Sequence, residues 1–377
     1  MLFRSLERIA AGDVVASFAL TEPGAGSNPA GLQTRAVRDG GDSAGDSAGD
    51  WVIDGQKRFI TNAPSADLFV VFARTRPADS SGTGIAVFLV PAGTPGVEVG
   101  AKDRKMGQEG AWTSDVLFSG VRVAASALVG GDADAGYRAA MTSLARGRVH
   151  MAALAVGTAQ RALDESVAYA ASATQGGTVI GDFQLVQAML ADQQTGVLAG
   201  RALVRETAAR YVSGEDRRIG PSAAKLFCTE MAGQVADLAV QIHGGSGYMR
   251  DVPVERIYRD VRLLRLYEGT SEIQRLIIGG GLIRAQQRRL STPGAAAVTG
   301  GYAPPASGGL TPTPASAYTG FPVGSPPVPA IHRRASHAPG PTGSSPASID
   351  ATSAASWFQN RAWVAVCCSR LASSVSW

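Results

Sequence analysis

This sequence has few cysteines, no long hydrophobic run and little net charge. Only three cysteines occur in 377 residues: Cys228 falls in an apolar, helix-like stretch, and Cys367 and Cys368 are adjacent. This spacing builds neither a disulfide framework nor a CxxC metal pattern. A chain of this length buries enough apolar surface to fold without cross-links. We therefore expect a reducing, cytoplasmic location.

No apolar run reaches the roughly 18 residues needed to cross a bilayer, so we expect no membrane span. The run from Val14 to Leu20 has about the length of a signal-peptide core. However, Asp13 precedes it, and Thr21 to Gly24 follow without a small-residue cleavage pattern. We interpret this run as a buried strand.

The net charge of +4 is unevenly distributed. Residues 291–377 contain four arginines and one aspartate, so residues 1–290 carry a net charge of only +1. A globular part this close to neutral has no basic footprint for nucleic acid. Nucleic acid is therefore not an expected partner.

Hydrophobic periodicity divides the chain into three parts: a β domain (1–130), a helical part (131–288) and a tail (289–377). Short apolar runs separated by Gly, Pro, Ser and Asp predict an antiparallel sandwich or barrel over 14–130. The Asp54-Gly55 pair inside "WVIDGQKRFIT" has the signature of a tight hairpin. The segment "GGDSAGDSAGD" (40–50) is typical of a mobile hairpin tip.

Apolar residues then recur at helical spacing over 138–172, 182–213 and 222–243, which predicts three long helices followed by a shorter one. In the third helix, the apolar stripe includes Phe227, Cys228 and Met231. Such helices favour an antiparallel bundle. The tail is rich in Pro, Gly, Ser, Ala and Thr, and we expect it to be disordered because it cannot bury enough apolar surface.

The glycine-rich segment "TEPGAGSNPAG" (21–31) does not fit the common phosphate-binding patterns. In G-x-G-x-x-G the third glycine would stand at Pro29, and no Gly-Lys-Ser/Thr sequence closes a phosphate loop. The segment could be an ordinary turn-rich loop or a polar ligand-binding loop that offers the hydroxyls of Thr21 and Ser27.

Six segments decide between these alternatives: "TEPGAGSN", "GQKRFITNA", "AQRALDE", "DFQLVQAML", "QIHGGSGYM" and "YEGTSEIQRLI", in this order. Together they resemble the acyl-CoA dehydrogenase family of flavoproteins, from about residue 5 to 284. The resemblance implies an α+β fold, with a middle β-barrel or sandwich domain and a C-terminal antiparallel four-helix bundle. It also implies FAD as cofactor, an acyl-CoA substrate in fatty acid metabolism, an electron-transfer flavoprotein as electron acceptor, and a homo-oligomer (dimer or tetramer).

In this family the glutamate of the Y-E-G-T motif is the catalytic base, and Glu268 occupies that position. Removing the weakly acidic α-proton of a thioester requires a carboxylate in a water-poor site, where burial raises its pKa toward the working pH. Some members carry the base at a position that aligns with Gly147, which has no side chain. The resemblance further implies that Ser27, Arg148 and Gly269 lie near the substrate.

The resemblance also assigns the flavin contacts. The segment along the isoalloxazine ring matches Phe18, Leu20, Thr21, Gly26 and Ser27. The segment whose threonine hydrogen-bonds near flavin N5 matches Phe59, Ile60 and Thr61. The pyrophosphate and adenosine positions, often supplied to a neighbouring subunit, match Phe183, Gln184, Gln241, Gly244 and Gly245. Further cofactor contacts match Thr270 and Glu272. We expect no metal, and interpret His243 as a packing or capping residue.

Three features depart from the family pattern. The family has a helical domain before the β domain, so we expect this chain to lack most of that domain. Ala173 and Gly176 replace an arginine and a phenylalanine, so an ionic contact with an FAD phosphate, worth on the order of 1–3 kcal/mol, is expected to be missing. The residues after Arg284 have no family counterpart.

Three functional hypotheses follow from the sequence. The first is an FAD-dependent acyl-CoA dehydrogenase that forms a trans-2-enoyl-CoA. The second is a truncated, catalytically impaired homologue that acts only as a subunit or remnant. The third is an acyl-CoA oxidase-like activity, which differs in oxygen access. Glu268 and the nearly intact flavin motifs favour the first.

Overall fold

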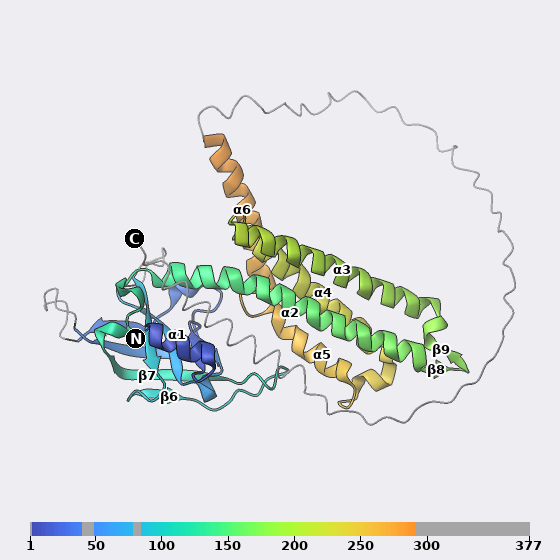
Figure 1. Ribbon diagram of the computed structural model, residues 1–377, viewed down its shortest axis with the longest axis horizontal. Helices are drawn as coiled ribbons and strands as arrows, with labels where there is room; N and C mark the ends of the chain where they lie inside the picture. Colours follow the sequence, from blue (N-terminus) through green and yellow to red (C-terminus); the bar gives the residue numbers. More distant parts are fainter. Residues whose placement is uncertain (1, 40–48, 78–83, 292–377) are drawn as a thin grey trace. The chain divides into compact units, whose positions relative to one another are not determined.

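A computed structural model describes residues 2–39, 49–77 and 84–291 (Figure 1). The tail that the sequence predicts to be disordered lies outside these residues from position 292 onward, as does most of the predicted mobile tip, residues 40–48. In the described ranges, no helix is both long and apolar enough to cross a bilayer.

The N-terminal part is a short helix and one curled sheet. Helix α1 (Leu2–Ala11) precedes seven strands: β1 (Ala16–Ala19), β2 (Arg35–Arg38), β3 (Trp51–Thr61), β4 (Leu68–Arg74), β5 (Ile85–Pro91), β6 (Val97–Val99) and β7 (Thr113–Val123). The strand order is β1-β4-β2-β3-β7-β6, with β5 paired to β4. The predicted β domain is confirmed, and so is the prediction of a buried strand within residues 14–20.

Strand β4 holds the sheet together because both of its faces are buried. Leu68, Val70 and Phe72 pack into one core, and Phe69 and Val71 pack into a second. This alternation follows from the two-residue period of a strand. It explains why the continuous apolar run in this segment is a strand with two buried faces.

Two expectations about the sheet are wrong. The sheet is not wholly antiparallel, because β1 and β2 both lie parallel to β4 along one of its edges. Asp54-Gly55 does not form a hairpin; β3 runs through it with a bulge against β7. A Cβ on Gly55 would lie 2.4 Å from Thr34 Oγ1, so glycine is required here for close approach to the neighbouring backbone.

The helical part contains α2 (Gly136–Ser172), α3 (Gln184–Ser213), α4 (Ile219–His243), α5 (Pro253–Arg262) and α6 (Ser271–Ser291), with a two-stranded ribbon of β8 (Thr174–Gln175) and β9 (Thr178–Val179) after α2. The predicted bundle is thus confirmed. The predicted apolar stripe of the third helix needs one correction, because Phe227 is 42% exposed while Cys228 and Met231 are buried.

The long helices α2, α3 and α4 lie side by side (Figure 1), and small side chains let them approach closely. Ala152, Ala155 and Ala159 of α2 share a core with Ala232 and Ala236 of α4. The contacts give the helix directions. Gln193 of α3 donates a hydrogen bond to the carbonyl of Val235 on α4, and a Cβ on Gly200 would touch Cys228, so α3 and α4 are antiparallel.

Candidate active site

The chain between α5 and α6 forms a strained turn that carries Glu268. Helix α5 ends at Arg262, a 3-10 turn (η7) spans Leu263–Arg265, and α6 begins at Ser271. Glu268 has a φ of 57° and Gly269 a φ of 87°. A left-handed conformation costs a non-glycine residue about 1–3 kcal/mol and persists only where its surroundings impose it.

The Glu268 carboxylate faces an environment that disfavours its charge. The residue is half-buried, but its Oε2 atom is shielded from solvent and has no hydrogen-bond partner among the described residues. Burial raises the pKa of Glu268 to about 7, against the opposing effects of the Arg148 and Lys225 cations. A carboxylate with this pKa is half-ionised near neutral pH and is suited to general-base chemistry.

Side chains from three helices bind the backbone of the turn. Arg148 Nε of α2 lies 3.4 Å from the Glu268 carbonyl oxygen, and Lys225 Nζ of α4 donates to the Gly269 carbonyl at 2.8 Å. Gln274 Nε2 of α6 donates to both carbonyls, at 3.1 and 2.8 Å. Arg148 was predicted from the sequence as a site residue, whereas Lys225 and Gln274 were not.

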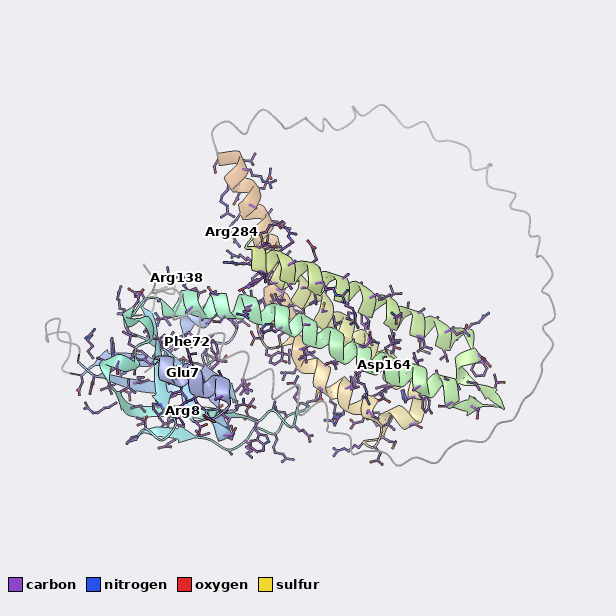
Figure 2. All side chains as sticks on the ribbon, viewed as in Figure 1. Glu7, Arg8, Phe72, Arg138, Asp164 and Arg284 are labelled. Atoms are coloured by element: carbon purple, nitrogen blue, oxygen red, sulfur yellow. The ribbon has the colours of Figure 1, made fainter. Side chains whose placement is uncertain are left out.

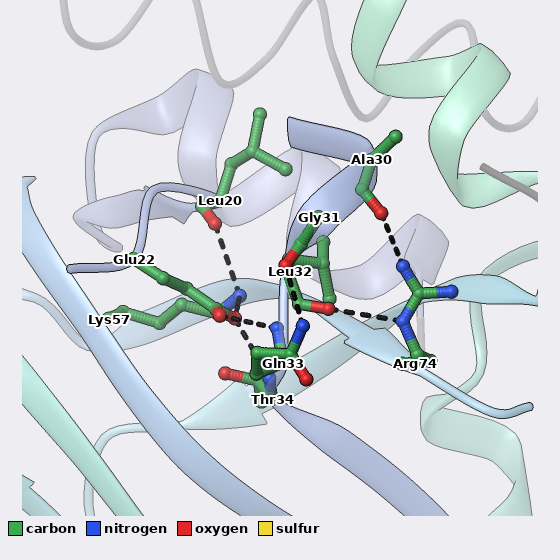
Figure 3. A network of polar contacts seen from close by, with 9 residues as sticks. All are labelled: Leu20, Glu22, Ala30, Gly31, Leu32, Gln33, Thr34, Lys57 and Arg74. Carbon is green, nitrogen blue, oxygen red and sulfur yellow. Dashed lines mark hydrogen bonds and ion pairs between the residues drawn. The ribbon is translucent and has the colours of Figure 1, made fainter. Parts of the chain in front are cut away.

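A second group of polar contacts shapes the glycine-rich loop of the β domain (Figure 3). Lys57 Nζ lies 2.7 Å from Glu22 Oε1 and donates to the Leu20 carbonyl at 3.1 Å. Glu22 also accepts hydrogen bonds from the backbone N–H groups of Gln33 and Thr34. Lys57 is fully buried. The ion pair therefore fixes where the loop leaves β1 and where it returns.

Both ionisable groups of this pair are perturbed by burial. Burial opposes the ionisation of Glu22, but the Lys57 ammonium and the backbone donors outweigh it, so the pKa of Glu22 is lowered. Burial lowers the pKa of Lys57 to about 8, although Glu22 acts in the opposite direction. Neither residue was singled out from the sequence, although both lie inside the motifs quoted above.

The end of β3 lies against the same loop. Arg58 N–H donates to the Thr21 carbonyl, and Ser17 Oγ donates to the Thr61 carbonyl, each at 2.9 Å. Phe59 has a φ of 57° and is 59% exposed. Strained backbone positions of this kind cluster at active sites and ligand-binding sites.

These parts line one pocket of about 1640 Å³. The segment of residues 103–113 closes it against α5, where Gln108 Nε2 donates to the Asp260 carbonyl at 3.1 Å and Arg259 donates to the Met106 carbonyl at 2.9 Å. Twelve of the residues predicted to form the site lie in its lining: Phe18, Leu20, Thr21, Gly26, Ser27, Phe59, Ile60, Thr61, Arg148, Glu268, Gly269 and Thr270.

The pocket is strongly cationic. Its lining contains nine arginines and lysines against three carboxylates: Arg58, Arg104, Lys105, Arg138, Arg148, Arg217, Arg218, Arg259 and Arg262 against Glu22, Asp103 and Glu268. Arginines of this kind suit an anionic ligand, phosphate groups in particular. The nearly neutral sum over residues 1–290 therefore conceals a local excess of positive charge.

The other predicted cofactor residues do not line this pocket: Phe183, Gln184, Gln241, Gly244, Gly245 and Glu272. Glu272 is exposed on the first turn of α6. Phe183 and Gln184 begin α3, and Gln241, Gly244 and Gly245 lie at the end of α4. Because α3 and α4 are antiparallel, these five residues lie at the same end of the bundle.

That end is far from Glu268. His243 stacks on Tyr169 of α2 with ring centroids 4.3 Å apart, which fits its predicted packing role, whereas Glu268 lies beside Arg148 of the same helix. Twenty-one residues of α-helix separate the two positions, or roughly 30 Å at 1.5 Å per residue. Figure 2 shows the same helix from Arg138, which lines the pocket, to Asp164.

The pocket residues fit a flavin. A Cβ on Gly26 would meet nothing within 4 Å, so the loop borders open space, and the rings of Phe18 and Phe59 offer apolar surface. Glu268 is among the residues that line the same pocket. No group of three or more potential metal ligands occurs within the described ranges.

Two family models match the chain: "Acyl-CoA dehydrogenase, middle domain" over residues 17–121 and "Acyl-CoA dehydrogenase, C-terminal domain" over residues 134–283. A caffeyl-CoA reductase–Etf complex subunit, CarC of Acetobacterium woodii, is 39% identical, covering 74% of this chain and 71% of that protein.

Solved structures are similar as well. The structure of butyryl-CoA dehydrogenase from Megasphaera elsdenii has a TM-score of 0.69 and 35% identity, covering 74% of this chain and 70% of that one. The FAD complex of PigA has a TM-score of 0.69 and 30% identity over the same shares.

Proposed function

Because this chain belongs to the acyl-CoA dehydrogenase family of flavoprotein oxidoreductases, we propose that it converts an acyl-CoA thioester to the trans-2-enoyl-CoA, with Glu268 as the base. The observation that carries this proposal is the buried, unpartnered carboxylate oxygen of Glu268 in a cationic pocket, with a pKa of about 7.

Glu268 would accept the α-proton of the thioester on its carboxylate. Near neutral pH a large fraction of the carboxylate is ionised, and its lack of hydrogen-bond donors leaves its lone pairs available. Arg148 and Lys225 lie close enough to favour the ionised form, which keeps the pKa of Glu268 from rising further. The left-handed turn sets the direction of the Glu268 side chain, and Gly269 places no side chain next to the carboxylate.

We propose FAD as the cofactor, held by the loop of residues 20–27, by Phe18 and by the segment Phe59 to Thr61. When bound, FAD supplies the acceptor for the β-hydrogen, which leaves as hydride. Ser27 and Arg148 would contact the substrate, and the arginines of the lining would pair with phosphates of the two ligands. Thr270 and Glu272 remain proposed cofactor contacts.

The chain is proposed to act as a homo-oligomer. Phe183, Gln184, Gln241, Gly244 and Gly245 lie roughly 30 Å along the bundle from the base, so they would serve the adenosine end of a flavin bound by a neighbouring subunit. The predicted boundaries, 1–130 for the β domain and 131–288 for the bundle, are retained as proposals.

The electron acceptor is proposed to be an electron-transfer flavoprotein, since the name of the relative CarC places that protein in a complex with Etf. A role in fatty acid metabolism and a cytoplasmic location follow from the same family resemblance and remain proposals. The alternative, a catalytically impaired homologue, is favoured by one sequence feature: Ala173 provides no cation for an FAD phosphate.

Anaerobic flavin reduction tests the proposed function directly. The purified full-length chain, loaded with FAD, is mixed with butanoyl-CoA and longer straight-chain acyl-CoAs while the visible flavin band is followed. We expect bleaching with the native chain, and retained flavin without bleaching in Glu268→Gln. Reduction of the variant at a near-native rate would refute the assignment of the base. No flavin binding in excess FAD would favour the impaired homologue.

A further inference from the structure

The backbone of the turn at Glu268 and Gly269 needs hydrogen-bond donors from outside the turn. Glu268 and Gly269 have consecutive positive φ values, 57° and 87°. Their carbonyl groups are therefore not satisfied by helix hydrogen bonds and must find other donors when buried. The position of the Glu268 carboxylate depends on whatever holds these two carbonyls.

Gln274 is the side chain that contacts both. Its Nε2 atom lies 3.1 Å from the Glu268 oxygen and 2.8 Å from the Gly269 oxygen. The residue is fully buried and sits in the first turn of α6, so a rigid helix fixes its backbone. Two other donors each contact one carbonyl: Arg148 for Glu268 and Lys225 for Gly269.

The orientation of the Gln274 amide is fixed by chemistry. Rotating the amide by half a turn would bring its oxygen against the two carbonyl oxygens, and neither of them can donate a hydrogen bond. Its own Oε1 atom has no hydrogen-bond partner among the described residues. A Cβ added to Gly269 would lie 2.7 Å from Gln274 Nε2, so the glycine and the glutamine fit each other.

We propose that Gln274, assisted by Lys225, is a positioning residue that holds the Glu268 turn in its left-handed conformation and so sets the rate of proton abstraction. The proposal rests on Glu268 being the base. Gln274 does not line the pocket, so its loss acts on the reaction through the turn and leaves flavin and acyl-CoA affinity nearly unchanged.

Gln193 supplies a matched control. It too is a fully buried glutamine on a long helix; its Nε2 donates to Ser166 Oγ and to the Val235 carbonyl, and its Oε1 has no partner among the described residues. It does not line the pocket. Gln193→Met therefore removes the same kind of buried amide without touching the turn.

The experiment compares Gln274→Met with Gln193→Met in the full-length, FAD-loaded chain. With butanoyl-CoA or the best straight-chain thioester, we expect the limiting rate of flavin reduction in Gln274→Met to fall on the order of 10²-fold, as small misplacements of catalytic groups do. The half-saturating thioester concentration and the flavin affinity should change less than about twofold, and Gln193→Met should reduce its flavin at the native rate.

A second readout does not depend on activity. In the flavin-free chain, amide hydrogen exchange in the peptide covering residues 266–275 should be faster in Gln274→Met than in the native chain, and unchanged in Gln193→Met. If Gln274→Met does not fold, Gln274→Asn carries the same expectations, because it withdraws the amide from both carbonyls by one methylene.

Native exchange and a native reduction rate in Gln274→Met would overturn the proposal, as would an equal loss of rate in Gln193→Met. Glu268→Gln is measured in parallel to separate the two proposals. If it reduces flavin normally, the base has been misassigned; if only Gln274→Met behaves as native, the positioning role alone is refuted.

Discussion

The strained, buried position of Glu268 should reduce the stability of the native fold at alkaline pH. In the folded chain the pKa of this carboxyl is raised from its ordinary value of 4.5 to about 7, first by burial. The folded state therefore holds the proton more tightly than the unfolded chain. Ionising the group costs folding free energy, and Glu268→Gln should remove that cost.

The magnitude and the pH window follow from the two pKa values. Below pH 4.5 the carboxyl is protonated in both states, and above about pH 7 it is ionised in both. Between them stability falls with rising pH, because the folded state binds more protons than the unfolded state. The full loss approaches about 3 kcal/mol, since one pKa unit corresponds to about 1.4 kcal/mol.

Thermal unfolding of the flavin-free chain at pH 5 and pH 8 measures this effect. We expect Glu268→Gln to raise the Tm at pH 8 on the order of 5 °C and to change it much less at pH 5. Glu22→Gln is the control of opposite sign, because the pKa of Glu22 is lowered and its loss leaves the buried Lys57 cation without an anionic partner. That variant should be destabilised at pH 8 by about 3–5 kcal/mol.

Equal Tm values for the native chain and Glu268→Gln at pH 8 would refute the reasoning. So would a gain of the same size at pH 5, because a gain independent of pH comes from packing and not from ionisation.

Two further predictions use the same structure. The rate of flavin reduction should rise with pH, with a midpoint near pH 7, as Glu268 ionises. Lys225→Met should move that midpoint to higher pH, because the Lys225 cation favours the carboxylate, while Lys225→Arg should leave it near 7. A shift to lower pH in Lys225→Met would contradict this prediction. Gly55→Ala should lower the free energy of unfolding by about 1–3 kcal/mol, because its Cβ would lie 2.4 Å from Thr34 Oγ1. Chemical denaturation should show a loss of less than about 0.5 kcal/mol for the control Gly93→Ala, whose Cβ meets nothing within 4 Å. Equal losses in the two variants would show that the close approach at Gly55 is unimportant.

The sequence predicted those features that depend on local patterning. The helices predicted over 138–172, 182–213 and 222–243 correspond to α2, α3 and α4, and each follows from apolar residues at helical spacing. Strand β4 was recognisable because a strand buried on both faces is a continuous apolar run.

Local patterning was misleading where one short signal has two structural uses. An Asp-Gly pair is typical of a hairpin turn, but glycine also permits a bulge and close contact with a neighbouring strand. At Gly55 the second use applies, and β3 continues because its partner β7 is long enough to pair on both sides of the bulge. Helix α1 was not predicted, because residues 1–130 were interpreted as a β domain.

The side chains that hold the backbone of the site could not be predicted, because tertiary contacts bring them there. Nothing in the segment around Lys225 shows that its ammonium reaches the carbonyl of Gly269, 44 positions later. A buried lysine inside an apolar helix is itself a signal, since such a charge must find a partner. Lys57 carries the same signal inside β3, and its partner Glu22 is 35 positions away.

The Y-E-G-T motif does not by itself fix the conformation of Glu268. Glu268 in a left-handed conformation is unfavourable by itself, and Gly269 relieves only its own residue. The conformation is imposed by donors on α2, α4 and α6, which meet only when the bundle is packed. The motif therefore specifies the carboxylate of the proposed base, while the packing of the bundle specifies its geometry. A chain that kept the motif but lost the Gln274 amide would retain the carboxylate but would no longer hold it in position.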